Sequence, residues 1–127
     1  MEAAPSSTNS PRPSKRGRLT PSPSEHLRIL RSSQHVVLAL DADQQQVIGF
    51  INALGDGVVS AFIPLLEVLP EHRGRGIGSE LVRRMLHELR HYRCIDLTCD
   101  GELRGFYTRL GMQPAGAMIV RQRPHRL

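Results

Sequence analysis

The sequence is poor in aromatic residues: it has no tryptophan, and aromatic side chains make up 4% of its 127 residues. Proteins that bind single-stranded nucleic acid stack bases on aromatic rings, so this scarcity argues against a nucleic-acid partner. No run of apolar residues is long enough to suggest a membrane partner, and no apolar secretory signal follows the N-terminus. The two cysteines, Cys94 and Cys99, are too few for a disulfide framework or a four-cysteine zinc site. We therefore expect a cytoplasmic protein without a metal.

Proline and serine, by contrast, are concentrated at the start of the chain. Residues 1–24 contain five prolines and six serines, and they carry +3 of the formal net charge of +5. Such a segment buries too little apolar surface to offset the entropy lost on ordering. The composition predicts a disordered basic tail over residues 1–24 and one domain over residues 25–127.

Hydrophobic periodicity in the domain indicates an α/β fold with a mixed (α+β) sheet. The expected elements are a helix at 25–31, strands at 35–40, 47–54 and 58–69, a helix at 76–92, a strand at 94–98, a helix at 102–110 and a strand at 112–122. Short turns should make the first three strands antiparallel, whereas the helical crossover should make the fourth parallel to the third. Pro64 must lie at a bulge or an unpaired edge, because proline cannot donate to a strand ladder.

A glycine-rich turn, Arg73–Ser79 (RGRGIGS), lies between the third strand and the long helix. The first turn of a helix leaves backbone N–H groups without partners, and the helix dipole favours an anion there. Arg73 and Arg75 add positive charge. The turn therefore predicts a site for a phosphate or pyrophosphate. It lacks the lysine of a Walker loop, and its G-x-G-x-G spacing departs from the dinucleotide-binding G-x-G-x-x-G pattern.

Two segments resemble the GNAT superfamily of N-acetyltransferases. Residues 65–78 (LLEVLPEHRGRGIG) look like its acyl-CoA-binding segment, whose [Q/R]-x-x-G-x-[G/A] signature is met by Arg73, Gly76 and Gly78. Residues 106–112 (FYTRLGM) are similar to its F-Y-x-x-x-G-[F/M] segment. The resemblance covers about residues 25–127 and implies the GNAT fold and acetyl-CoA as cosubstrate. Family members usually begin with another strand and helix, so the chain would be an N-terminally shortened example.

The resemblance also assigns roles to individual residues. Tyr107 would be the general acid that protonates the leaving thiolate, although it could instead be an ordinary core aromatic. Glu67 would be the general base, or else an ion-paired surface carboxylate. Asp100 would bond the pantetheine arm or simply cap the following helix. The remaining positions implied to contact the coenzyme are Val68, Leu69, Arg73, Gly74, Arg75, Gly76, Ile77, Gly78 and Ser79.

Two functions remain open at this point. The first is transfer of an acetyl group from acetyl-CoA to a primary amine by direct attack in a ternary complex. The acceptor would be a small-molecule or peptide amine. The alternative is a CoA-binding or interaction module of the same fold with little or no turnover. An exposed sheet edge would also allow a homodimer.

A second motif suggests a different function, that of a zinc peptidase. Residues 87–91 (HELRH) match the H-E-x-x-H string of these enzymes. In the predicted helix His87 falls opposite the apolar face, among charged residues. A catalytic zinc pair must instead line a walled cleft with a third ligand. We therefore interpret the string as part of a solvated helix face.

Overall fold

The computed structural model describes residues 21–122 of the chain. The predicted tail lies outside these residues except at its end, where helix α2 (Pro23–Ser32) begins two residues before the expected domain boundary. A capping box fixes this start: the Ser22 hydroxyl accepts from the Glu25 N–H (3.2 Å), and the Glu25 carboxylate accepts from the Ser22 N–H (2.8 Å). Such a cap satisfies two backbone donors at once.

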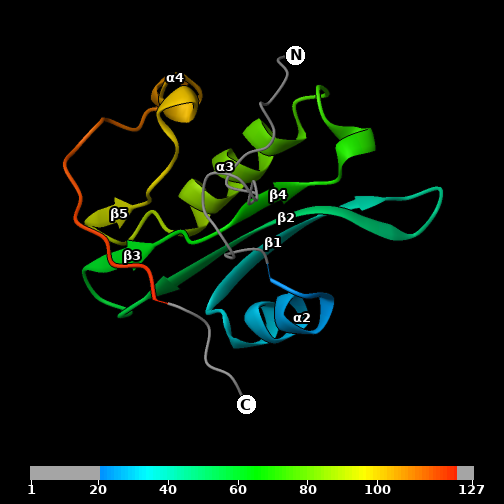
Figure 1. Cartoon of the computed structure of the whole chain (residues 1–127), viewed down its shortest axis with the longest axis horizontal. Coiled ribbons are helices and arrows are strands. Elements are labelled where there is room, and N and C mark those ends of the chain that lie inside the picture. The colour runs from blue at the N-terminus through cyan, green and yellow to red at the C-terminus, as the bar shows by residue number, and fades with distance from the viewer. Residues whose placement is uncertain (1–20, 123–127) are drawn as a thin grey trace.

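The described residues form the predicted mixed sheet. Its strands are β1 (His35–Asp41), β2 (Gln46–Gly55), β3 (Ser60–Phe62), β4 (Leu66–Val68) and β5 (Cys94–Asp96). The order is β1-β2-β3-β5, and β4 pairs with β2 beyond the end of β3. All pairs that involve β2 are antiparallel, and β3 and β5 are parallel, which confirms the expected directions (Figure 1).

The single strand expected over residues 58–69 is in fact two strands separated at Pro64. The Ile63 N–H still donates to the Asp96 carbonyl (2.9 Å), so the chain follows β5 up to this point. Beyond Pro64, the Leu65 N–H donates to the Asn52 side chain (3.0 Å), and β4 continues along β2 alone. Because proline has no N–H, the ladder is interrupted there. One edge of β4 is consequently not paired with β5.

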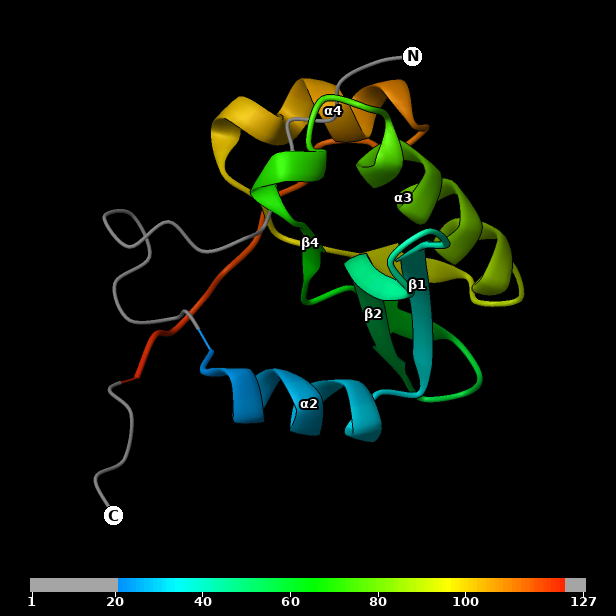
Figure 2. The ribbon, with the colours of Figure 1, turned by 90° about the vertical axis from the view of Figure 1, so that its right-hand side faces the viewer.

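Helices cover both faces of the sheet. Figure 2 shows α2 on one side, and α3 (Ile77–Glu88) and α4 (Arg104–Arg109) on the other. Short 3-10 turns at Pro70–His72 and Gly101–Leu103 precede α3 and α4. Helix α3 ends at Glu88, four residues before its predicted end. None of the helices within residues 21–122 is long and apolar enough to cross a membrane.

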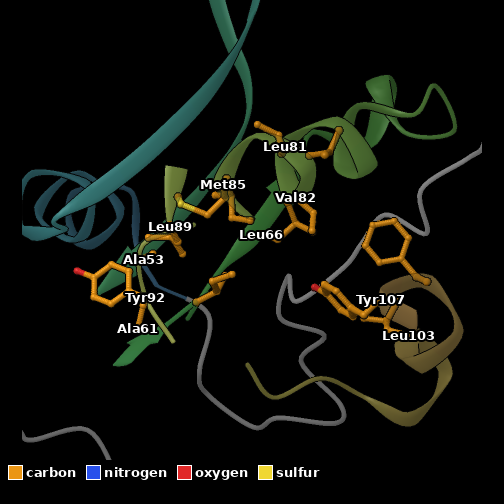
Figure 3. Close-up of a cluster of buried hydrophobic side chains, with 14 residues drawn as sticks. Ala53, Ala61, Leu66, Leu81, Val82, Met85, Leu89, Tyr92, Leu103 and Tyr107 are labelled. Carbon is orange, nitrogen blue, oxygen red and sulfur yellow. The ribbon is translucent and has the colours of Figure 1, made fainter. Parts of the chain in front are cut away.

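The hydrophobic core lies between the sheet and helices α3 and α4 (Figure 3). Helix α3 contributes the inner face that its periodicity predicts: Val82 and Met85 are fully buried against Ile51 of β2. Alternation along β2 and β4 sends Ile51, Leu66 and Val68 into this core. The residues between them, among them Glu67, therefore face α2.

The strand predicted over residues 112–122 does not form. Gly111 ends α4 with a positive φ of 101°, as expected of a helix stop, but the chain beyond it has no regular secondary structure. It runs beside β5 and β3 (Figure 1) and pairs with no strand within residues 21–122. Pro114 and Gly116 interrupt the segment, and Met118 is 98% exposed. The apolar residues of the segment do not make a strand by themselves, because a strand also needs a neighbour to accept and donate backbone hydrogen bonds.

Candidate active site

The glycine turn forms a kinked entry into α3. Gly74 and Gly76 both adopt left-handed backbone conformations, with φ of 79° and 78°. Gly76 is the N-cap of α3, and no side chain hydrogen-bonds to the first turn of that helix. A residue with a Cβ would be strained at either glycine. The first-turn N–H groups are therefore available to an anion, as the sequence predicts.

The two arginines of the turn are held by hydrogen bonds. The Arg73 Nε donates to the Val68 carbonyl (3.1 Å), which ties the turn to the open edge of β4. An Arg75 Nη lies 2.8 Å from the Nδ1 of His72. Both side chains are exposed. The turn thus keeps two positive charges beside the start of α3, which favours a bound anion further.

The remaining residues of the turn continue into α3 and are less accessible. Gly78 and Ser79 are buried in its first turn, and Ile77 packs against the core. Their backbones continue the turn into α3, and Ile77 and Ser79 contribute side chains to the packing of the helix on the sheet.

The backbone of β4 has one paired edge and one open edge. The Leu69 N–H donates to the Ile48 carbonyl of the β2 segment (2.8 Å), so this amide is already used. Successive residues of a strand direct their N–H and C=O groups to opposite edges. The groups of Val68 therefore face away from β2, in agreement with the Arg73 contact. Of the two predicted pantetheine-binding residues, the structure makes Val68 the one that presents its backbone.

Tyr107 lies on α4 and is 4% exposed. Its ring packs edge-on against Phe106, with centroids 4.9 Å apart, and projects from α4 towards the strands (Figure 3). It also lines a cavity of about 460 Å³ beside β5, whose other walls are Phe62 of β3, residues 95–99, Arg104, Thr108 and residues 112–118. Neither Glu67 nor the glycine turn lines this cavity. Tyr107 is therefore both a core residue and a cavity residue.

Glu67 lies on the opposite face of the sheet, under α2. It stands across from Phe50 of β2, and its side chain is 20% exposed. Its Oε2 lies 3.1 Å from the Nε2 of His26 on α2. Sequence reasoning assigned no role to His26, because no motif surrounds it. Only the docking of α2 over β4 brings together two residues that are 41 positions apart.

Asp100 precedes the 3-10 turn at Gly101–Leu103. Its carbonyl accepts from the Leu103 N–H (2.9 Å), but its carboxylate makes no capping hydrogen bond. The capping alternative is therefore not realised, and a contact between Asp100 and the pantetheine arm stays a prediction.

The H-E-x-x-H string does not form the predicted helical pair. Helix α3 ends at Glu88, so His91 lies beyond it and stacks on Tyr92 with ring centroids 4.2 Å apart. His87 is exposed. Within residues 21–122, no group of three histidine, cysteine, aspartate or glutamate side chains is arranged to hold a metal ion.

Comparison with protein families decides the classification of the chain. The model of the acetyltransferase (GNAT) family matches residues 5–112, which span the glycine turn, β4 and α4. The chain belongs to the GNAT family. Its mixed sheet is a GNAT sheet, and the matched range includes the glycine turn.

Solved structures agree with this assignment. A candidate acetyltransferase from Deinococcus radiodurans R1 is 49% identical, with 80% of this chain and 71% of that chain covered and a TM-score of 0.76. A GNAT family acetyltransferase from Streptococcus pneumoniae TIGR4 is 29% identical, with 83% of each chain covered and a TM-score of 0.68. Glucosamine-6-phosphate N-acetyltransferase from Arabidopsis thaliana, at 14% identity, 84% coverage of each chain and a TM-score of 0.69, shares the fold. No curated protein matches the chain.

Proposed function

We propose that this GNAT protein is an N-acetyltransferase that moves an acetyl group from acetyl-CoA to a primary amine by direct attack in a ternary complex. The observation that carries the proposal is the uncapped, glycine-lined start of α3 beside the open edge of β4. The start of α3 offers backbone donors for a diphosphate, and the neighbouring strand edge is free for an extended arm that contains amides. A glycine turn that only packs the helix on the sheet would need neither the free donors nor the free strand edge.

Acetyl-CoA fits the residues present. The left-handed Gly74 has open space where a Cβ would lie, so the backbone can approach a diphosphate closely. The amides from Arg73 to Ser79 would bind the diphosphate, and Val68 would pair with the pantetheine arm. Leu69 would contribute packing rather than its amide. Asp100, which follows β5, would contact the pantetheine arm from the side opposite β4.

The chain's own groups would move the protons of the reaction. Acetyl-CoA supplies the acetyl group as a thioester. Glu67 would take the proton from the substrate ammonium, which frees the nitrogen lone pair for attack on the thioester carbon. The Val68 N–H would stabilise negative charge on the thioester oxygen. Tyr107 would give its hydroxyl proton to the sulfur as the carbon–sulfur bond breaks.

The role of Tyr107 is tested by Tyr107→Phe in an assay of thiol release from acetyl-CoA across a panel of primary amines. The wild type should release thiol with one or more amines. The variant should lose at least about tenfold in kcat while its affinity for acetyl-CoA stays unchanged. Tyr92→Phe is the matched control, because Tyr92 is equally buried and its hydroxyl contacts His35 away from the glycine turn. Equal kcat in the wild type and Tyr107→Phe would remove the acid from the mechanism.

The same assay, together with the Tm measured with and without acetyl-CoA, separates catalysis from binding alone. A higher Tm with acetyl-CoA, but no thiol release with any amine, would indicate the CoA-binding module instead. The proposal includes a small-molecule or peptide amine as acceptor and a cytoplasmic location. We also propose that the protein forms a homodimer. Light scattering, which measures the molar mass of the protein in solution, tests this.

A further inference from the structure

Strand β5 has one edge in the sheet and one edge outside it. The Asp96 carbonyl accepts from the Ile63 N–H (2.9 Å), so the backbone groups of Asp96 face the β3 side. Successive residues of a strand direct their backbone groups to opposite edges. The N–H and C=O groups of Ile95 and Leu97 therefore face the outer edge, with which no strand of residues 21–122 pairs.

A cavity of about 460 Å³ lies along this outer edge (Figure 1 shows the two chain segments beside each other). Residues 95–99 line it on the strand side, and residues 112–118, which return from α4, line it on the other side. Buried backbone groups need hydrogen-bond partners. A slot that runs along an unpaired strand edge consequently suits an extended segment, which brings its own backbone donors and acceptors.

The returning chain ends in a segment that resembles a strand in composition. Met118, Ile119 and Val120 are three consecutive apolar residues with exposures of 98%, 59% and 79%. Residues 117–122 contain no proline or glycine, and β-branched side chains fit a pleated strand. The described part of the chain thus has both a strand edge without a partner and a strand-like segment that belongs to no sheet.

We propose that residues 117–122 of a second copy occupy the slot and pair with the outer edge of β5, and that two copies exchange this segment reciprocally. Residues 112–116 stay beside their own β5, and the chain crosses to the other copy after Gly116. This inference rests on the homodimer of the proposed function and assigns its interface. The exchange pairs both free edges and covers both apolar segments by one two-fold contact.

The apolar side chains of the segment match one face of β5. Ile95 and Leu97 are partly buried and pack against the core. Side chains alternate along a strand, so Met118 and Val120 share one face of the segment. In the exchanged arrangement they lie beside Ile95 and Leu97 and extend the core sideways. Their burial provides the hydrophobic driving force for association.

The other face supplies complementary charges. Asp96 is exposed on β5, between the inward-facing Ile95 and Leu97. In the segment, Arg121 lies on the face opposite Met118 and Val120, so it joins Asp96 on the outer side of the extended sheet. Opposite charges on neighbouring strands stabilise their pairing. This complementarity favours residues 117–122 of a second copy over an apolar segment without a cation.

The first test is the molar mass of the full-length chain, measured by light scattering over a range of concentrations. One chain has a mass of 14.2 kDa, and the wild type should approach twice that value. Val120→Lys should raise the Kd of the dimer at least about tenfold, because the ammonium would be buried without a partner. Val58→Lys is the matched control: Val58 is 70% exposed and does not line the cavity, so this variant should dimerise like the wild type.

Charge reversal tests the pairing of the two strands. Asp96→Arg and Arg121→Asp should each raise the Kd of the dimer about tenfold, since every dimer contains the pair twice. The double variant should return the Kd to within about threefold of the wild type. Without this rescue, the two side chains do not meet, and the proposed arrangement is wrong.

Hydrogen exchange reports on the strand edge itself. The amides of Ile95 and Leu97 should exchange slowly in the wild-type dimer and at least about tenfold faster in Val120→Lys. Slow exchange in a protein that stays monomeric would overturn the inference, because the segment would then close the slot of its own copy.

Two further outcomes would overturn the inference in different ways. A dimer that is disrupted by Leu40→Lys, on the exposed edge strand β1, but not by Val120→Lys would keep the homodimer and place its interface elsewhere. A wild type with the mass of one chain at every concentration would remove the homodimer as well. Neither result depends on acetyl transfer, so a failure of the proposed activity in the thiol-release assay is distinguishable from both.

Discussion

At the scale of single residues, Asn52 is the side chain on which the geometry of β4 depends. It is 1% exposed; its Oδ1 accepts from the Leu65 N–H just past Pro64, and its Nδ2 donates to the Ser33 hydroxyl at the end of α2 (3.0 Å). Asn52→Ala would leave a backbone donor without its acceptor. We expect a loss of about 2 kcal/mol in the free energy of unfolding, measured with urea.

The control for this prediction is Ser33→Ala, which removes the α2 end of the same chain of hydrogen bonds and leaves Leu65 satisfied. It should cost about 1 kcal/mol. If Asn52→Ala is as stable as the wild type, the break at Pro64 is held by packing alone.

At the residue scale, the sequence can name candidate site residues only where a motif carries them. Glu67, Tyr107 and the glycines could be named because they occupy fixed places in two family segments. His26 and Asn52 could not, since each acts through a contact with a residue distant in the chain. Their importance depends on how α2 lies against the sheet, which no local pattern encodes.

At the scale of elements, the turn between β2 and β3 is fixed by one carboxylate. Asp56 Oδ1 accepts from the N–H groups of Val58 (2.8 Å), Val59 (2.8 Å) and Ser60 (3.1 Å). These hydrogen bonds, that of Val58 first, lower the pKa of Asp56 below its ordinary value of 3.8. A lowered folded-state pKa means that the carboxylate stabilises the fold above about pH 3.8, and that this contribution is lost as the pH falls through the folded-state pKa.

Asp56→Ala should therefore lower the Tm at pH 7, and the difference from the wild type should shrink below about pH 3.8. Thermal unfolding followed by circular dichroism across this range measures both effects. Asp43→Ala, in the exposed turn between β1 and β2, is the control and should change the Tm less. A difference that is equal at pH 7 and pH 3 would contradict the prediction.

The same scale shows what the hydrophobic pattern could and could not predict. Strand directions and the helix stop at Gly111 follow from local rules of turns and crossovers, and the structure agrees with them. The division at Pro64 was foreseeable as an irregularity, but not as the point where β4 leaves β5. The missing strand at residues 112–122 shows that apolar residues alone cannot supply the partner that a strand edge requires.

At the scale of the whole molecule, β4 connects the two faces of the sheet. The side chains of Leu66 and Val68 enter the core under α3, the side chain of Glu67 meets α2, and the backbone of Val68 faces the open edge. A three-residue strand thus sets the position of the Glu67 side chain, of its contact with His26 and of the open backbone edge. Asn52 and Arg73 hold its two ends, so the position of this strand depends on a contact at each end.

Binding of acetyl-CoA should consequently stabilise the whole domain. Ligand at about one hundred times its Kd adds about 2.7 kcal/mol to the free energy of unfolding, because it binds the folded state alone. Gly74→Ala places a Cβ at a left-handed position, where the structure has open space. This variant should lose about 1 kcal/mol without ligand and should show a smaller rise in Tm on adding acetyl-CoA.

Gly116→Ala separates the two effects, since a Cβ there also meets open space but its backbone is not left-handed. This control should match the wild type both with and without acetyl-CoA. If Gly74→Ala keeps the full rise in Tm, the diphosphate does not lie against the glycine turn. If the wild type shows no rise at millimolar acetyl-CoA, the turn serves only to pack α3 on the sheet, and the proposed transfer has no coenzyme site.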